Sequence, residues 1–115
     1  MHREFIYTPT FDKRWERLKL SDIDLRELEQ LLLEDPERGD TETGTGGIKK
    51  MRFAPSRSNQ GKSGSYRVVY LNIPVTHRTI CILVFTKSEQ ASLSKEEKNE
   101  LKKLSIQLKQ LYGQP

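Results

Sequence analysis

Four basic side chains in the second half of this sequence have types and spacing that suit chemistry on a phosphate group. Lys50 and Arg52 lie two residues apart, on one face of a predicted strand whose other face is apolar. Arg67 stands among apolar residues of the next predicted strand, where an unpaired cation is unfavourable. Lys87 directly follows an apolar run that predicts a third strand. If the three strands pair antiparallel, the four side chains converge on one surface; otherwise they are separate solvated positions.

RNA is a substrate that such a cluster can cleave without a metal. The 2′-hydroxyl lies next to its own phosphodiester, so an enzyme needs to align the two, accept one proton, donate another and stabilise the charge on phosphorus. Arginine clamps phosphate oxygens but stays protonated, whereas a lysine beside other cations can exchange protons near neutral pH. The cluster therefore predicts a metal-independent endoribonuclease that leaves a 2′,3′-cyclic or 3′-phosphate. Which lysine is the base and which the acid stays open.

The distribution of charge also predicts a polyanionic partner. Residues 1–42 hold seven Lys or Arg and twelve Asp or Glu, whereas residues 43–88 hold eight Lys or Arg and no acid. A solvated surface usually mixes both signs, so this block indicates a face that meets phosphate. The rival interpretation is a basic half that only needs solubility. Besides the four cations above, the block supplies four predicted contacts to RNA or the ribosome: Lys49, Arg57, Lys62 and Arg78.

Other motifs that carry chemistry are weak or absent in the sequence. The GKS at 61–63 lacks the earlier glycine of a nucleotide-binding loop, where Ser56 stands, and it leads into a strand rather than a helix. His2 and His77 have no cysteine or carboxylate at ligand spacing, so we expect no metal and no cofactor. The only cysteine, Cys81, lies in the most apolar run and is predicted to pack in the core.

Capping signals and periodicity define the elements that hold these side chains. A strand is predicted over 4–7, followed by a short helix that Thr8 caps and Pro9 begins. A capping box at 21–24 begins a second helix, which Pro36 ends. Both helices carry an apolar stripe, so we expect a helical hairpin packed on a sheet.

The rest of the sequence predicts strands and one long helix. Alternating residues predict strands over 48–53 and 66–73, and the apolar run 79–85 predicts a central, covered strand. A capping box at 94–97 begins a C-terminal helix. We therefore predict one α+β domain, residues 1–115, with a mainly antiparallel sheet of about four strands, an N-terminal helical hairpin and a C-terminal helix. The apolar stripe of that last helix is Leu101, Leu104, Leu108 and Leu111.

The composition argues against a membrane or secreted protein. No apolar run approaches the roughly 18 residues that a membrane span needs, and the N-terminus lacks the apolar core of a cleaved signal. A single cysteine is compatible with a reducing compartment. We therefore expect a cytoplasmic protein without membrane contact.

Three stretches resemble a known family: GTGGIKKMR (44–52), GKSGSYRVVY (61–70) and LVFTKSEQASLSKEEKNELKKL (83–104). Their order and spacing are similar to those of the RelE/ParE toxin superfamily, most closely its HigB branch, over nearly the whole chain. The resemblance implies a small RelE-like fold and a bacterial type II toxin that cuts translated mRNA in the ribosomal A site, beside 16S rRNA. It also implies a cognate HigA-like antitoxin with a helix-turn-helix.

The resemblance carries over to individual positions. Lys50 and Arg52 match the family's basic second strand, and Arg67 matches the arginine that contacts the scissile phosphate. Lys87 matches the basic residue after the last strand. Tyr112 is a poor match for the C-terminal tyrosine that some members use, so the resemblance implies the phosphate clamp but assigns no proton donor or acceptor. The sequence also departs from the family pattern at Ser65, Thr86 and Ser88.

Two other functions stay open at this point. A ParE-type toxin shares the fold but inhibits DNA gyrase, and it would not need converging cations. A non-catalytic RNA- or ribosome-binding module would use the same basic block without cleaving anything. Either nucleic-acid function predicts an affinity that falls steeply with salt.

Overall fold

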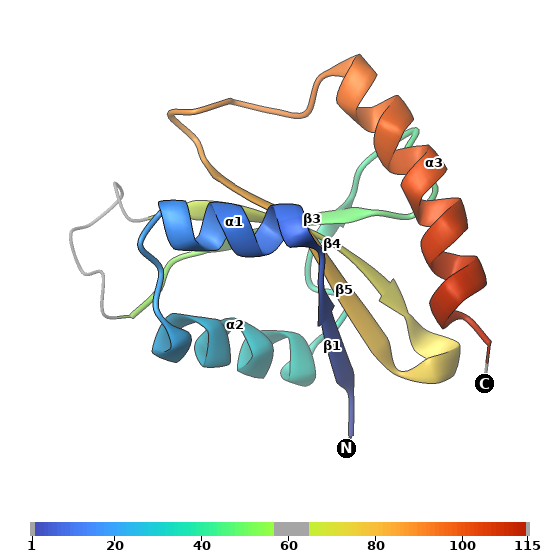
Figure 1. Cartoon of the computed structure of the whole chain (residues 1–115), viewed down its shortest axis with the longest axis horizontal. Coiled ribbons are helices and arrows are strands. Elements are labelled where there is room, and N and C mark those ends of the chain that lie inside the picture. Colours follow the sequence, from blue (N-terminus) through green and yellow to red (C-terminus); the bar gives the residue numbers. More distant parts are fainter. Residues whose placement is uncertain (1, 57–64, 115) are drawn as a thin grey trace.

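The computed structural model describes residues 2–56 and 65–114. These residues form an α+β fold in which three α-helices surround one five-stranded sheet (Figure 1). The helices are α1 (Pro9–Arg17), α2 (Asp22–Glu34) and α3 (Lys95–Tyr112). Within the described part of the chain, no helix combines the length and the apolar character that crossing a membrane requires.

The sheet has the strand order β1-β5-β4-β3-β2, which makes the most apolar strand an internal one, as predicted. β5 (Arg78–Thr86) pairs in parallel with β1 (Glu4–Tyr7) and antiparallel with β4 (Tyr66–Ile73). β4 pairs antiparallel with β3 (Lys49–Phe53), which pairs antiparallel with β2 (Asp40–Thr41) at the edge. The sequence predicted about four strands, because the two residues of β2 are too few to leave a period-two pattern.

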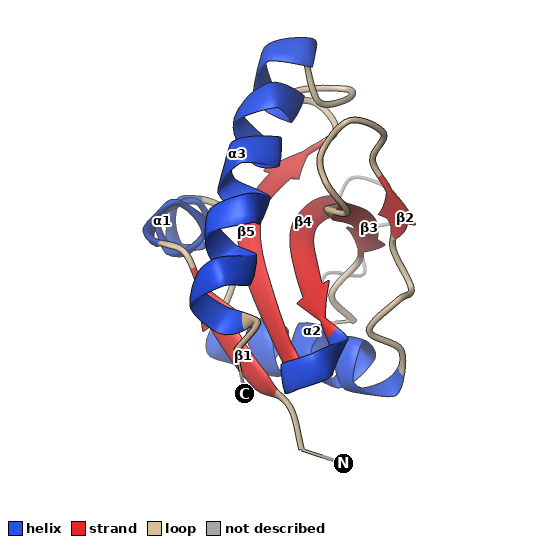
Figure 2. Ribbon diagram, turned by 90° about the vertical axis from the view of Figure 1, so that its right-hand side faces the viewer, coloured by secondary structure: helices blue, strands red, loops and turns tan. Residues whose placement is uncertain are grey.

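Each face of the sheet is covered by its own apolar cluster. Phe11 and Trp15 of α1, together with leucines of α2, pack on one face. Leu101 and Leu108 of α3 pack on the other, where α3 runs along the sheet (Figure 2). Side chains of β4 alternate between the two clusters as predicted: Val68 and Tyr70 face the first, and Val69 and Leu71 face the second.

The predicted helix starts are confirmed because they depend on local hydrogen bonds. The side chain of Thr8 accepts the N–H of Phe11 at 3.1 Å, and Pro9 is the first helical residue. Ser21 and Ser94 each take part in a complete capping box, in which the N3 carboxylate also accepts the backbone N–H of the capping serine.

The predicted apolar stripe of α3 is wrong at its last position. Leu111 is 68% exposed, whereas Leu101 and Leu108 are buried. Four residues after Leu108 the chain reaches Tyr112, which packs against the second cluster. Because positions i and i+4 share a helix face, Tyr112 takes the place that the sequence pattern had given to Leu111.

The glycine-rich loop between β2 and β3 is closed by hydrogen bonds and packs against α3. Buried Thr45 donates its hydroxyl to the carbonyl of Glu42 at 2.6 Å and accepts the N–H of Ile48 at 3.1 Å. Lys109 of α3 donates to the carbonyl of Gly46 at 2.6 Å. These contacts hold the residues that lead into β3 in one position.

We predict that the contact between this loop and α3 stabilises the fold. Gly44 and Gly46 both have a positive φ, of 82° and 74°, so alanine at either costs roughly 1 kcal/mol in backbone strain. A Cβ at Gly46 would also lie 2.5 Å from Ser105 Oγ, whereas one at Gly44 meets nothing within 4 Å. Gly46→Ala should therefore lower the free energy of unfolding by roughly 2 kcal/mol, about twice the loss in Gly44→Ala. Urea denaturation measures both, and equal losses would contradict the packing.

Candidate functional site

Three of the four predicted cations, Lys50, Arg52 and Arg67, line one open pocket of about 420 Å³. The pairing of β3 with β4 explains this arrangement, because Arg52 lies directly opposite Arg67. Residues directly opposite in an antiparallel pair point to the same face. The remaining lining residues are Met51, Arg38 and Asp40, of which the last two were not singled out from the sequence.

Arg52 and Arg67 are like charges on neighbouring strands. Directly opposed like charges destabilise a sheet, and within residues 2–56 and 65–114 neither guanidinium forms an ion pair with a carboxylate. In the same part of the chain, the Arg67 guanidinium donates to Ser65 Oγ at 3.1 Å and to the carbonyl of Tyr66 at 3.3 Å. An anion with several oxygens, such as a phosphate group, would relieve the repulsion by accepting hydrogen bonds from both arginines.

Two carboxylates that precede the acid-free block fold back onto it. The pairing of β2 with β3 sets Asp40 opposite Lys50. Glu42 Oε1 then lies 3.7 Å from Lys50 Nζ, and both side chains are largely covered, at 15% and 20% exposure. The basic face predicted from the acid-free block therefore also carries two acids. Asp40 and Glu42 precede the acid-free block in the sequence, but the pairing of β2 with β3 brings both residues beside β3.

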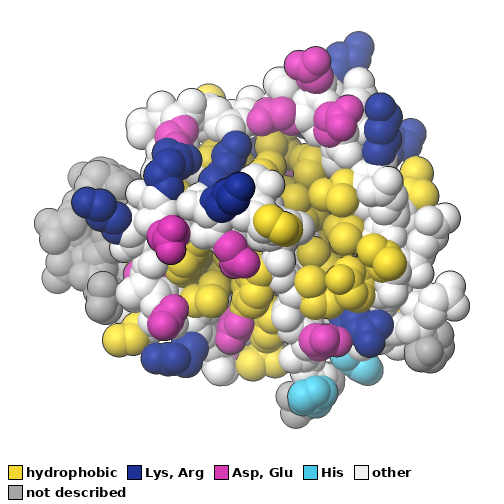
Figure 3. All heavy atoms as spheres, in the orientation of Figure 1, with side chains coloured by type: hydrophobic (Ala, Val, Ile, Leu, Met, Phe, Trp, Pro, Cys, Tyr) yellow, Lys and Arg dark blue, Asp and Glu magenta, His cyan; other side chains and the backbone are white. Residues whose placement is uncertain are grey.

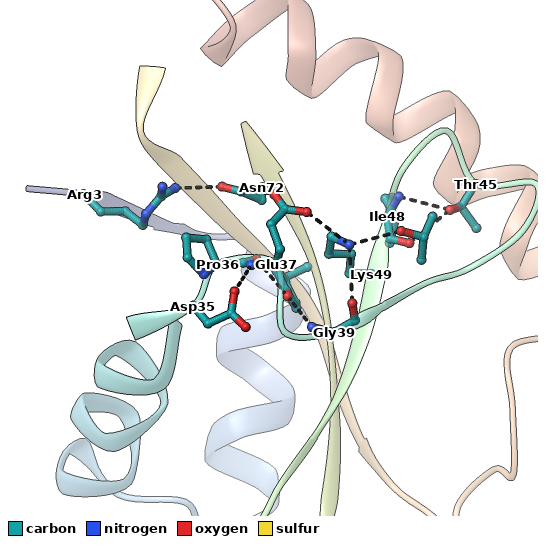
Figure 4. Close-up of polar contacts among 11 residues, drawn as sticks. Arg3, Asp35, Pro36, Glu37, Gly39, Thr45, Ile48, Lys49 and Asn72 are labelled. Carbon is teal, nitrogen blue, oxygen red and sulfur yellow. Dashed lines mark hydrogen bonds and ion pairs between the residues drawn. The ribbon is translucent and has the colours of Figure 1, made fainter. Parts of the chain in front are cut away.

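Lys49, a predicted RNA contact, lies on the face of β3 opposite to the pocket, where protein groups bind its ammonium. Its ammonium forms an ion pair with Glu37 at 3.2 Å and donates to the carbonyl of Gly39 at 3.3 Å and to Thr41 Oγ1 at 3.1 Å (Figure 4). Glu37 in turn accepts a hydrogen bond from Asn72. Lys49 therefore fastens the chain before β2 to the sheet, and it does not line the pocket.

Tyr70 anchors the segment that brings Arg38 and Asp40 to the pocket. Its ring is fully buried in the core, so it is not available to stack on a base. Its hydroxyl donates to the carbonyl of Pro36 at 3.0 Å and accepts the N–H of Gly39 at 2.9 Å. Burial is the main cause that raises the pKa of Tyr70 to about 12, so the phenol stays neutral and keeps both bonds.

Lys87 lies at the same end of the sheet as Arg67 but outside the pocket. It is exposed, in the turn that begins where β5 ends at Thr86, beside the first residues of β4. That turn is closed by Glu89, whose carboxylate accepts the N–H of Thr86 at 2.8 Å. This bond is the main reason that the pKa of Glu89 is lowered. The predicted convergence therefore applies to three cations, with Lys87 at the rim of the sheet.

The remaining predicted RNA contacts lie elsewhere. Arg78 stands at the other end of β5, opposite Ile73, six residues along β4 from Arg67 and thus roughly 20 Å away. It forms an ion pair with Glu4 at 2.8 Å. Arg57 and Lys62 lie outside the described residues.

A second, larger pocket of about 780 Å³ lies between α1, β5 and α3. Figure 3 shows hydrophobic side chains gathered between α1 and α3, with acidic side chains near them. Among the described residues, none of the predicted site residues lines this larger pocket. Its lining holds more carboxylates, those of Glu96, Glu97 and Glu100, than cations, those of Arg14 and Lys103, so it suits a polyanion less well than the basic pocket. The smaller basic pocket is therefore the candidate site for chemistry on phosphate.

Side chains of the described residues could bind a metal ion only if several ligating groups lay close together. Among them, no group of three or more His, Cys, Asp or Glu side chains is arranged to hold a metal ion. Cys81 is fully buried, and burial raises the pKa of its thiol, so it packs in the core as predicted. The charged side chains that line the basic pocket are Arg38, Asp40, Lys50, Arg52 and Arg67.

Comparison with known proteins identifies the family. Residues 5–114 match the family described as the RelE toxin of the RelE/RelB toxin–antitoxin system. The structure is similar to that of a mutant of the E. coli toxin RelE in the free state, with a TM-score of 0.53 and 21% sequence identity over 79% of this chain and 90% of that chain. This similarity supports the fold, and the family match covers nearly the whole chain. The chain therefore belongs to the RelE toxin family, the ribosome-dependent mRNA endonucleases of toxin–antitoxin systems.

Proposed function

We propose that Lys50, Arg52 and Arg67 form the centre at which this toxin cleaves mRNA. The observation that carries the proposal is the pair of directly opposed arginines in an open pocket, without an ion pair to a carboxylate of the described residues. The pair is unfavourable in the free protein. It becomes favourable when a phosphodiester supplies the missing negative charge.

Each side chain of the centre has a distinct task. Arg52 and Arg67 hold the non-bridging oxygens of the scissile phosphate and stabilise the charge that grows there as the 2′-oxygen attacks. Both stay protonated throughout, so neither takes the proton of the 2′-hydroxyl. Lys50 carries protons that it can donate, and its ion pair with Glu42 at 3.7 Å keeps its ammonium beside the pocket.

The other cations of the block are assigned to binding. Lys87, exposed at the end of the sheet that carries Arg67, is suited to hold the RNA backbone next to the scissile phosphate. Arg57, Lys62 and Arg78 would contact mRNA or 16S rRNA in the A site, whereas Lys49, whose ammonium is held by Glu37, Gly39 and Thr41, fastens the chain before β2. For Arg78 the separation of roughly 20 Å from Arg67 suits ribosomal RNA rather than the cleaved bond.

The resemblance supports finer assignments as well. We assign the chain, as one domain over residues 1–115, to the HigB branch, with a HigA-like helix-turn-helix antitoxin as its partner and the cytoplasm as its compartment. A DNA gyrase inhibitor would have no use for the opposed arginines, so the basic pocket favours RNA cleavage over that rival. A ribosome-binding module without activity would be distinguished by the absence of cleavage.

Replacement of Arg67 tests the proposal most simply. We predict that Arg67→Ala lowers the cleavage rate at least about 100-fold, because one preorganised donor to the reacting phosphate contributes on that scale. The assay is primer extension on mRNA in a reconstituted translation reaction, with and without ribosomes. Arg26→Ala, an exposed arginine on α2, is the matched control and should cleave normally. Unchanged cleavage by a folded Arg67→Ala protein would rule out the proposed centre.

The opposed arginines also predict that a substitution can raise the stability of the protein while it lowers cleavage. Arg52→Gln removes one of two like charges, so it should raise the free energy of unfolding by roughly 0.5 kcal/mol at low salt while it lowers cleavage. The gain should shrink in 0.5 M salt, where charges are screened within a few ångströms. Thermal melts at both salt concentrations measure it. A protein that melts lower than wild type at low salt would contradict the repulsion.

A further inference from the structure

The cations of the pocket leave one proton of the reaction without a recipient. The 2′-hydroxyl has to lose its proton as its oxygen attacks phosphorus. Arginine has five donors and no acceptor, and a protonated lysine has three donors and no acceptor. A carboxylate, in contrast, has only acceptors. The question is therefore whether a carboxylate of this chain lies where the 2′-hydroxyl would be.

Asp40 lines the same pocket as the three cations. The pairing of β2 with β3 sets it directly opposite Lys50, so both side chains point to the same face. The next pair along these strands, Thr41 and Lys49, points to the other face, where Lys49 Nζ lies 3.1 Å from Thr41 Oγ1. The alternation along β2 thus agrees with the position of Asp40 in the pocket.

The two carboxylates near Lys50 differ in their bonds. Glu42 is largely covered and is paired with Lys50 at 3.7 Å. Asp40 is exposed, and its carboxylate makes no hydrogen bond or ion pair with another described residue. Its acceptor atoms are therefore open to a ligand in the pocket, whereas those of Glu42 are engaged with the lysine.

Asp40 is also well placed by the backbone that precedes it. The N–H of Gly39 is bonded to the buried hydroxyl of Tyr70 at 2.9 Å. A Cβ at Gly39 would lie 3.0 Å from the carbonyl of Lys50 and 3.0 Å from the ring of Tyr70, so the chain approaches β3 more closely than a larger residue would allow. A rigid support of this kind is what a catalytic side chain needs.

We propose that Asp40 is the general base of the cleavage reaction. Its carboxylate takes the proton of the 2′-hydroxyl as the bond from the 2′-oxygen to phosphorus forms. The bond from phosphorus to the 5′-oxygen breaks, and Lys50 donates a proton to that oxygen. The products are a 2′,3′-cyclic phosphate and a 5′-hydroxyl, and one proton exchanged with solvent restores both side chains. This inference rests on the proposed function, since it requires the basic pocket to be the cleavage site.

The test compares the single-turnover cleavage rates of two mRNAs on the ribosome. One is unmodified, and the other has sulfur in place of the bridging 5′-oxygen at the cleaved bond. A thiolate leaves without a proton, so sulfur removes the need for a general acid but not for a general base. The proteins are wild type, Asp40→Asn, Lys50→Ala and Asp22→Asn, the last being a control at an exposed aspartate at the start of α2.

We expect Asp40→Asn to cleave unmodified mRNA at least about 100-fold more slowly than wild type at saturating protein, since general base catalysis contributes roughly 100- to 10,000-fold. The sulfur substrate should leave that defect in place, whereas it should restore most of the rate of Lys50→Ala. Asp22→Asn should match wild type. Asp40→Glu, which keeps a carboxylate, should retain more activity than Asp40→Asn.

Several outcomes would overturn the inference. Wild-type cleavage by Asp40→Asn would exclude Asp40 as the base and leave the proposed function intact. If the sulfur substrate restored the cleavage rate of Asp40→Asn, Asp40 would act on the leaving group as a general acid and not as the base. A defect that disappears at saturating protein would make it a binding residue only. If wild type itself cuts neither mRNA, the proposed function fails and the inference fails with it. Circular dichroism melts establish that each variant is folded.

Discussion

The pairing of β3 with β4 sets Arg52 directly opposite Arg67, and the rest of the fold has to hold this unfavourable contact in place. Opposed like charges cost roughly 0.2–1 kcal/mol relative to neutral pairs. The register cannot slip to relieve them, because a shift by one residue would turn every buried side chain of β4 to the wrong face. Two apolar clusters, one on each face of the sheet, fix that register.

In the described part of the chain, two acids near the pocket pair with lysines, and Arg52 and Arg67 are left without an ion pair. Glu37 pairs with Lys49 and Glu42 pairs with Lys50, while neither reaches the opposed guanidiniums. The positive charge available to a ligand is thus concentrated on the two side chains that can clamp a phosphate in a bidentate way. Lys49 and Glu37 also fasten the chain before β2, which brings Asp40 to the same pocket.

Much of the fold could be predicted from the sequence, because its signals are local. Capping boxes at Ser21 and Ser94 and the alternation in β3 and β4 require only neighbouring residues to agree. β2 could not be predicted, because two residues are too few to show an alternating pattern. Its position also depends on a hydrogen bond between Gly39 and Tyr70, which lies some thirty residues away in the sequence. Asp40 and Glu42 therefore went unnoticed as neighbours of the cations. Leu111 is exposed because Tyr112, four residues after Leu108, packs on the sheet instead, and the leucine spacing does not show which of the two positions is buried.

The central claim is that Arg52 and Arg67 act as one clamp on one phosphate, and a double-mutant cycle tests it most directly. The measurement is the single-turnover rate of mRNA cleavage on the ribosome for Arg52→Ala, Arg67→Ala and the double variant. Residues that act as a unit give strongly non-additive losses. We predict that the double variant is about as slow as the slower single variant. Losses that multiply would mean two independent contacts and would contradict the account.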